Sequence, residues 1–139
     1  MWSTANLFTV TAFVEAAFGL ALLAVPSVVI TVLLGVDQAS PEALVIGRLG
    51  GAGLLAIGVA CWIAHRDAGR PSQRGLAYGA LVYNVGAVAV LAYAGSILAM
   101  AGALLWPGVA LHTALTAWCL VCLVGAAPSH QLKPDHGRR

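Results

Sequence analysis

Charged residues are scarce in this sequence, and their scarcity excludes a soluble domain. Asp, Glu, Lys and Arg together make up 9% of the 139 residues, whereas hydrophobic residues make up 60%. A soluble domain carries about 25% charged residues because its surface faces water. The mean hydropathy of +0.91 points the same way. The composition therefore predicts an integral membrane protein whose main partner is the lipid bilayer, and we expect no nucleic-acid partner.

Cysteine is also scarce, and the common catalytic motifs are lacking. The three cysteines are Cys61, Cys119 and Cys122. Cys119 and Cys122 have the spacing of a metal or redox pair, but they lie in an apolar segment without a neighbouring charge or a second pair, so we expect buried hydrophobic side chains and no metal site. The sequence contains no phosphate loop, dinucleotide fingerprint, nucleophile elbow or zinc-protease motif. It indicates no catalytic residue and no cofactor, and an enzyme is the less favoured class.

Four apolar stretches have the length of a membrane crossing, which takes about 20 residues. They cover residues 6–25, 43–64, 75–98 and 107–126. Ser40, Pro41 and Glu42 are typical of a helix start at the second stretch. The first stretch is followed by Pro26 and the apolar segment Val28 to Gly35, for which two structures stay open: the extension of a kinked helix, or a helix lying along the interface.

We therefore predict an all-α integral membrane fold, a single four-transmembrane-helix bundle in residues 1–128 followed by a polar, disordered tail in residues 129–139. Lysine and arginine near membrane spans are retained in the cytoplasm. Outside the spans, these residues fall in the loop between the second and third spans and in the tail: Arg66, Arg70, Arg74, Lys133, Arg138 and Arg139. An even number of spans places both groups on one side, so we predict that the N-terminus and the C-terminus are cytoplasmic.

Polar side chains within the spans are the candidate functional residues, because a charge at the centre of a membrane helix costs about 2.5 to 3.5 kcal/mol and has to be offset by pairing or function. At a rise of about 1.5 Å per residue, they fall near the midplane or in the outer half of the bilayer. We predict that they form one intramembrane, ligand-binding polar layer: Glu15, Arg48, Asn84, His112 and Tyr83.

Two interpretations of this polar layer stay open. Glu15 and Arg48 are within reach of each other and can form an ion pair that only orders the helices. Alternatively, Arg48 holds an anion or a carbonyl group, Glu15 accepts a proton and His112 donates one. Tyr83 and Asn84 are about 100° apart on a helix, so they do not both face one pocket, and we favour Asn84.

Glycines cluster around Arg48. Gly47 and Gly51 have the small-xxx-small spacing that lets another backbone approach closely. We predict helix packing at these two residues, either within the bundle or between two copies in a homo-oligomer.

The first two spans resemble small four-helix bacterial membrane proteins, namely DoxX-like proteins and the uncharacterised DUF4345-type families. The resemblance rests on Glu15-x-x-x-Gly19-Leu20, on Pro26 and Leu34-Gly35, and on Gly47-Arg48-Leu49-x-Gly51-x-Gly53-Leu54-Leu55 followed by Gly58 and Trp62. It implies a multi-pass protein of the bacterial inner membrane, in some relatives associated with quinone-linked or other redox systems. It transfers no catalytic residue.

Three functions are compatible with these observations. The favoured one is an accessory or binding subunit that holds a lipid- or quinone-like apolar ligand at the polar layer. The alternatives are a purely structural or assembly partner of another membrane protein, and a proton-coupled transporter or membrane enzyme that uses Glu15 and His112. Ligand binding predicts a cavity at the polar layer, whereas a structural role predicts paired side chains without a void.

Overall fold

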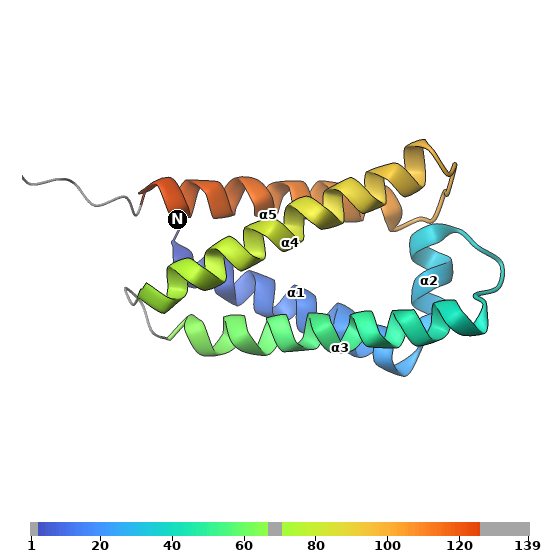
Figure 1. Ribbon diagram of the computed structural model, residues 1–139, viewed down its shortest axis with the longest axis horizontal. Helices are drawn as coiled ribbons and strands as arrows, with labels where there is room; N and C mark the ends of the chain where they lie inside the picture. Colours follow the sequence, from blue (N-terminus) through green and yellow to red (C-terminus); the bar gives the residue numbers. More distant parts are fainter. Residues whose placement is uncertain (1–2, 67–70, 126–139) are drawn as a thin grey trace, which may run out of the picture.

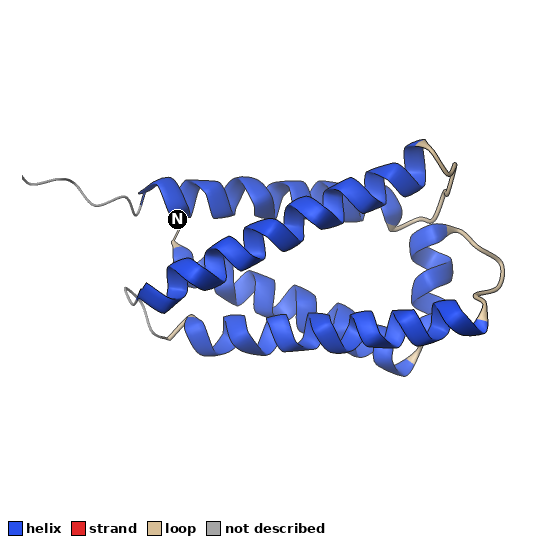
Figure 2. Ribbon diagram, in the orientation of Figure 1, coloured by secondary structure: helices blue, strands red, loops and turns tan. Residues whose placement is uncertain are grey.

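The computed structural model describes residues 3–66 and 71–125, and in this part of the chain all regular structure is helical. The helices are α1 (Thr4–Ala24), α2 (Pro26–Leu34), α3 (Pro41–Ala64), α4 (Pro71–Ser96) and α5 (Leu105–Gly125) (Figures 1 and 2). Four of them, all except α2, are long and apolar enough to cross a membrane. The prediction of an all-α, four-span protein is confirmed, with span boundaries shifted by a few residues. The predicted tail at residues 129–139 lies outside the described residues.

Serine side chains cap the N-termini of two of the long helices. Ser3 Oγ accepts a hydrogen bond from the Asn6 amide, and Ser40 Oγ accepts one from the Ala43 amide, each at 3.2 Å. These side chains satisfy amides that have no partner in the first helical turn. Pro41 follows Ser40 at the first position of α3, where its missing N–H is not needed. The predicted start of the second span is therefore correct.

The segment after Pro26 is a separate short helix rather than an extension of the first span. Val25 leaves the helical region of φ and ψ, and α2 starts at Pro26, whose ring is incompatible with continuing the preceding helix. At the other end of α2, Gly35 takes a φ of 74°, a left-handed conformation that favours glycine. The long helices run along the molecule, and α2 crosses the bundle near one end (Figure 1).

The closest helix packing joins α1 to α3, and glycine makes it possible. A Cβ atom added to Gly51 would lie 2.8 Å from the Gly19 carbonyl oxygen, and one added to Gly19 would lie 2.7 Å from the Gly51 oxygen. Further along α3, a Cβ atom on Gly58 would lie 3.0 Å from the Ala12 oxygen. Gly47 approaches the side chain of Ile30 in α2. The face of α3 that carries Gly47 and Gly51 thus packs within the molecule.

A hydrophobic core lies at the end of the bundle where α1 begins. Side chains from all four long helices form it: Leu7, Phe8, Ala12, Cys61, Ala77, Ala80, Leu115, Cys119, Cys122 and Leu123. Toward the opposite end, α3 and α4 diverge (Figure 1). The packed core therefore occupies only about half of the length of the bundle.

The opposite end is closed by α2 and the loop before α5. The Leu104 amide donates a hydrogen bond of 3.1 Å to the Val32 carbonyl oxygen. Gly102 lies directly against the backbone of Leu33, since an added Cβ atom would clash with the Leu33 carbonyl group. Gly95 of α4 packs against Leu105 and Trp106, which joins α4 to the start of α5. These contacts hold α2 across the end of the bundle.

Candidate ligand-binding site

A cavity of about 690 Å³ lies between the α1–α3 pair and the α4–α5 pair. Its walls are mainly apolar side chains of the four long helices together with Leu33 of α2. Ligand sites in proteins typically have volumes of about 300 to 1,000 Å³ and a predominantly apolar lining with a few polar groups. Three polar side chains, Glu15, Tyr83 and His112, line this cavity. Its size and lining are those of a site for an apolar molecule.

The cavity is open to the surface between α3 and α4. Gly50 and Gly53 of α3 line it and are exposed, and Val90 of α4 lines it with 66% of its surface exposed. A Cβ atom added to Gly50 or Gly53 would meet nothing within 4 Å. Because α3 and α4 are long enough to cross a membrane, this opening faces the region that the bilayer would occupy.

Glu15 supplies the carboxyl group of the cavity, and one of its two oxygen atoms lacks a hydrogen-bond partner. The residue is 1% exposed. Its Oε2 atom accepts a hydrogen bond of 3.3 Å from the Tyr83 hydroxyl, whereas its Oε1 atom is buried without a hydrogen-bond partner. Buried polar atoms without partners are uncommon because each one loses its hydration without compensation. Oε1 therefore keeps an unused hydrogen-bonding site on a side chain that lines the cavity.

His112 is held in place by Asn84. The Asn84 Nδ2 group donates to the Ala80 carbonyl oxygen at 2.7 Å, and the Asn84 Oδ1 atom lies 2.7 Å from His112 Nδ1. Asn84 is completely buried and does not line the cavity, whereas His112 does. The Tyr83 ring meets the His112 ring edge to face, with centroids 5.6 Å apart. Tyr83 thus contacts both Glu15 and His112.

Four of the five predicted polar residues come together, and Arg48 does not join them. Arg48 is exposed and lies outside the cavity lining, so the expected convergence of all five residues was wrong. Among the described residues, no ion pair joins Arg48 to Glu15, whose Oε1 atom has no partner. At about 100° per residue, Arg48 lies about 160° from Gly50 and about 180° from Ile57, both cavity residues. The rise per residue along the helix predicts the depth of Arg48 in the membrane, but not the face of α3 on which it lies relative to the cavity.

The preference for Asn84 over Tyr83 as the pocket residue was also wrong. As expected, the two residues do not both line the cavity. Tyr83 is the one that lines it, whereas Asn84 is hydrogen-bonded to His112. Gly50 and Gly53 were not predicted as parts of the cavity wall. Helical spacing could have identified them, because Gly47, Gly51 and Gly58 lie on one face of α3, whereas Gly50 and Gly53 lie on an adjacent face.

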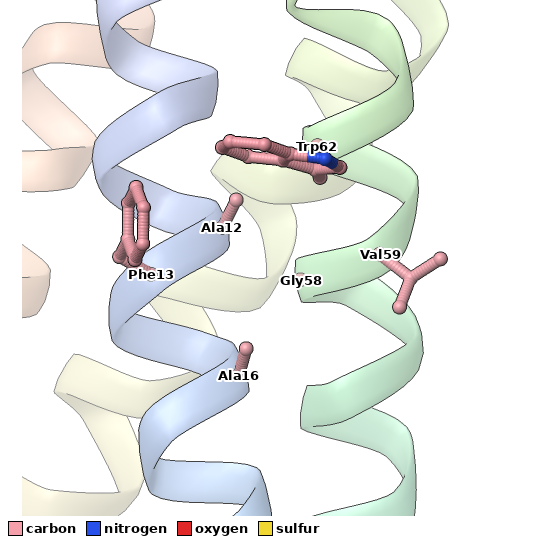
Figure 3. A pocket seen from close by; sticks show the side chains of 6 residues that line it. All are labelled: Ala12, Phe13, Ala16, Gly58, Val59 and Trp62. Atoms are coloured by element: carbon pink, nitrogen blue, oxygen red, sulfur yellow. The ribbon is translucent and has the colours of Figure 1, made fainter.

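Two other hollows in the described part of the chain have no polar side chain pointing into them. Figure 3 shows one of about 220 Å³, where Ala12 and Ala16 of α1 face Gly58 of α3 beneath the Trp62 ring. The second, of about 490 Å³, is an apolar groove beside Trp118 on α5. Neither offers more than apolar contact.

The cysteines do not contribute to the cavity. Cys61, Cys119 and Cys122 are free thiols buried in the hydrophobic core. Within residues 3–66 and 71–125, no group of three or more His, Cys, Asp or Glu side chains is placed to hold a metal ion.

Comparison with protein-family models, with curated proteins and with solved structures finds no match to this chain. The resemblance to DoxX-like and DUF4345-type proteins thus stays a prediction, and the function has to be inferred from the site itself.

Proposed function

We propose that this chain is a membrane-embedded binding protein that holds a lipid- or quinone-like apolar molecule in the cavity between its two helix pairs. One observation carries the proposal: an apolar cavity of about 690 Å³ is lined by Glu15, whose buried Oε1 atom has no hydrogen-bond partner within the described part of the protein. Such an atom is expected where a ligand supplies the missing hydrogen bond.

The lining of the cavity supports a ligand with one polar end and an apolar remainder. The polar residues lie where the packed core ends, and the remaining lining toward α2 is apolar. A hydrocarbon tail fits this apolar part, and its head group fits beside Glu15. The opening between α3 and α4 gives access from the bilayer without transfer through water.

A purely structural role is the weaker alternative. Side chains that only order the helices would pair with one another and leave no void. Asn84 and His112 do pair in this way, but the cavity beside them is large and one Glu15 oxygen is unpaired.

We further propose that the protein lies in the bacterial inner membrane, with both termini and the connection between α3 and α4 on the cytoplasmic side. The start of α1, the end of α3, the start of α4 and the end of α5 lie at the same end of the bundle (Figure 1). Arg66 and Arg74, both exposed, are at this end, and such residues are retained in the cytoplasm.

Native mass spectrometry tests the binding function. The full chain is purified from its membranes in mild detergent as wild type and as Gly53→Leu, which adds a large side chain at the cavity wall where an added Cβ atom would meet nothing within 4 Å. Gly86→Leu is the matched control, because Gly86 is an exposed glycine of α4 with equally open surroundings outside the cavity. Arg48→Ala is a second control.

We expect wild type, Gly86→Leu and Arg48→Ala to carry the same co-purifying small molecule, and Gly53→Leu to lose it while remaining folded. An empty wild-type protein, or a molecule retained equally by Gly53→Leu, contradicts the proposal.

A further inference from the structure

We infer that the cavity selects ligands whose head group donates hydrogen bonds and carries no negative charge, that is, a hydroxyl or an ammonium group. This inference rests on the proposed function and narrows its ligand class: the hydroxyl groups of a reduced quinol fit it, whereas the carbonyl oxygens of an oxidised quinone only accept and do not. It comes from the direction of the hydrogen bonds around Glu15, Tyr83 and His112.

The hydrogen bonds of Asn84 fix which nitrogen of His112 carries hydrogen. The Asn84 Nδ2 group, the only donor of that side chain, is used by the Ala80 carbonyl oxygen at 2.7 Å. The Asn84 Oδ1 atom faces His112 Nδ1 at 2.7 Å and can only accept. Nδ1 therefore donates. In a neutral imidazole, Nε2 then has a lone pair and no hydrogen, so it is an acceptor on the ring edge away from Asn84.

The Tyr83 hydroxyl is likewise committed. Its hydrogen points to Glu15 Oε2 at 3.3 Å, so it is not free for a ligand. The remaining Glu15 atom, Oε1, is buried without a hydrogen-bond partner, and it accepts when the carboxyl group is ionised. With Glu15 ionised, two side chains that line the polar end of the cavity thus keep an unused acceptor each, Glu15 Oε1 and His112 Nε2, and a complementary head group donates.

The charges around the cavity point to the same class. In the part of the chain that the structure describes, neither lysine nor arginine lines the cavity, and Arg48 lies on another face of α3. A carboxylate or phosphate head would meet Glu15 without a compensating cation, and like charges in an apolar surrounding repel strongly. An ammonium head would be attracted to Glu15, and a hydroxyl head would donate to it.

Photolabelling with a matched probe series tests this inference. Four probes share one alkyl chain with a diazirine and differ only in the head: hydroxyl, ammonium, methyl ether or carboxylate. The full chain is placed in phosphatidylcholine nanodiscs, irradiated with each probe and digested, and labelled residues are mapped by mass spectrometry. Gly53→Leu and Gly86→Leu, the blocking variant and its control, show which labelling comes from the cavity.

We expect the hydroxyl probe, the ammonium probe or both to label cavity residues about tenfold more than the methyl ether and carboxylate probes, the factor that one charge-assisted hydrogen bond supplies. The probe of these two that labels more strongly shows whether the preferred donor is a hydroxyl or an ammonium group. Glu15→Ala should remove the preference among heads.

Two failures are distinguishable. If all four probes label cavity residues equally, or the methyl ether or carboxylate probe labels them most, the head-group inference is wrong and the proposed binding function stands. If no probe labels the cavity more in the Gly86→Leu control than in Gly53→Leu, the proposed function fails and the head-group inference fails with it.

Discussion

Asn84 and His112 form a direct side-chain hydrogen bond between α4 and α5. The bond is 2.7 Å long and Asn84 is completely buried, so both partners are ordered by it. Hydrogen bonds between membrane helices contribute on average about 0.6 kcal/mol and up to about 2 kcal/mol. The pair therefore positions His112 more than it stabilises the bundle.

A double-mutant cycle measures this contribution. We expect Asn84→Ala and His112→Ala each to destabilise the protein, with a coupling energy of about 0.6 to 2 kcal/mol between them. The free energy of unfolding is followed by circular dichroism as SDS is added to mixed micelles. Strictly additive effects of the two substitutions would show that the bond makes no net contribution.

Single residues also show which properties of the site could be predicted from the sequence and which could not. Glu15, Tyr83, Asn84 and His112 could be found because few polar side chains occur in the spans, and spacing along each helix gave their depth. Arg48 has a comparable depth but faces another direction. Direction depends on which face of α3 meets α1, and that is decided by backbone contacts at Gly19 and Gly51 rather than by polarity.

Among the elements, the α1–α3 pair depends on close backbone approach. A Cβ atom at Gly51 would lie 2.8 Å from both the Gly19 oxygen and the Leu22 Cβ atom, and the first of these is backbone that cannot rotate away. Small residues at helix contacts are the usual basis of packing within membranes, where the hydrophobic effect does not drive helices together. The pair should therefore be sensitive to a single methyl group.

We expect Gly51→Ala to lower the free energy of unfolding by about 1 to 3 kcal/mol, the usual effect of overpacking. Gly86→Ala is the matched control, since its Cβ atom meets nothing within 4 Å and should be neutral or stabilise the helix by up to about 1 kcal/mol. Both are measured by unfolding in SDS mixed micelles. Equal effects of the two substitutions would contradict close packing at Gly51.

The four long helices were predictable because length and hydropathy alone identify a membrane span. The short helix α2 was not, because an apolar segment after a proline is compatible with a kinked span and with an interfacial helix. Its position depends on contacts with residues far along the chain, such as the hydrogen bond from the Leu104 amide to the Val32 oxygen.

The whole molecule combines a packed half and a hollow half. The core at the end where α1 begins keeps the four long helices together, and the divergence of α3 and α4 toward α2 leaves the cavity (Figure 1). The polar side chains lie at the boundary between the halves. A ligand in the cavity would therefore be anchored at mid-height and held by apolar contacts toward α2.

The proposed orientation of this molecule in the membrane rests on the different charge of its two ends. The end with Arg66 and Arg74 should face the cytoplasm, and the end with α2 and the loop before α5 should face outward. Cysteine labelling can test this, since Cys61, Cys119 and Cys122 are buried and can be replaced by alanine to give a background without thiols.

In intact cells, we expect a membrane-impermeant maleimide to label Gln38→Cys and Ala103→Cys, which are exposed at the outer end, and to label Ser3→Cys only after the membrane is opened. Gln38 and Ala103 lie in two different loops, so agreement between them controls for local effects on reactivity. The reverse pattern would mean that the basic loop is outside. Ser3, before α1, and Ala103, before α5, lie at opposite ends of the bundle (Figure 1). Labelling of Ser3→Cys and Ala103→Cys from the same side of the membrane would therefore contradict this arrangement.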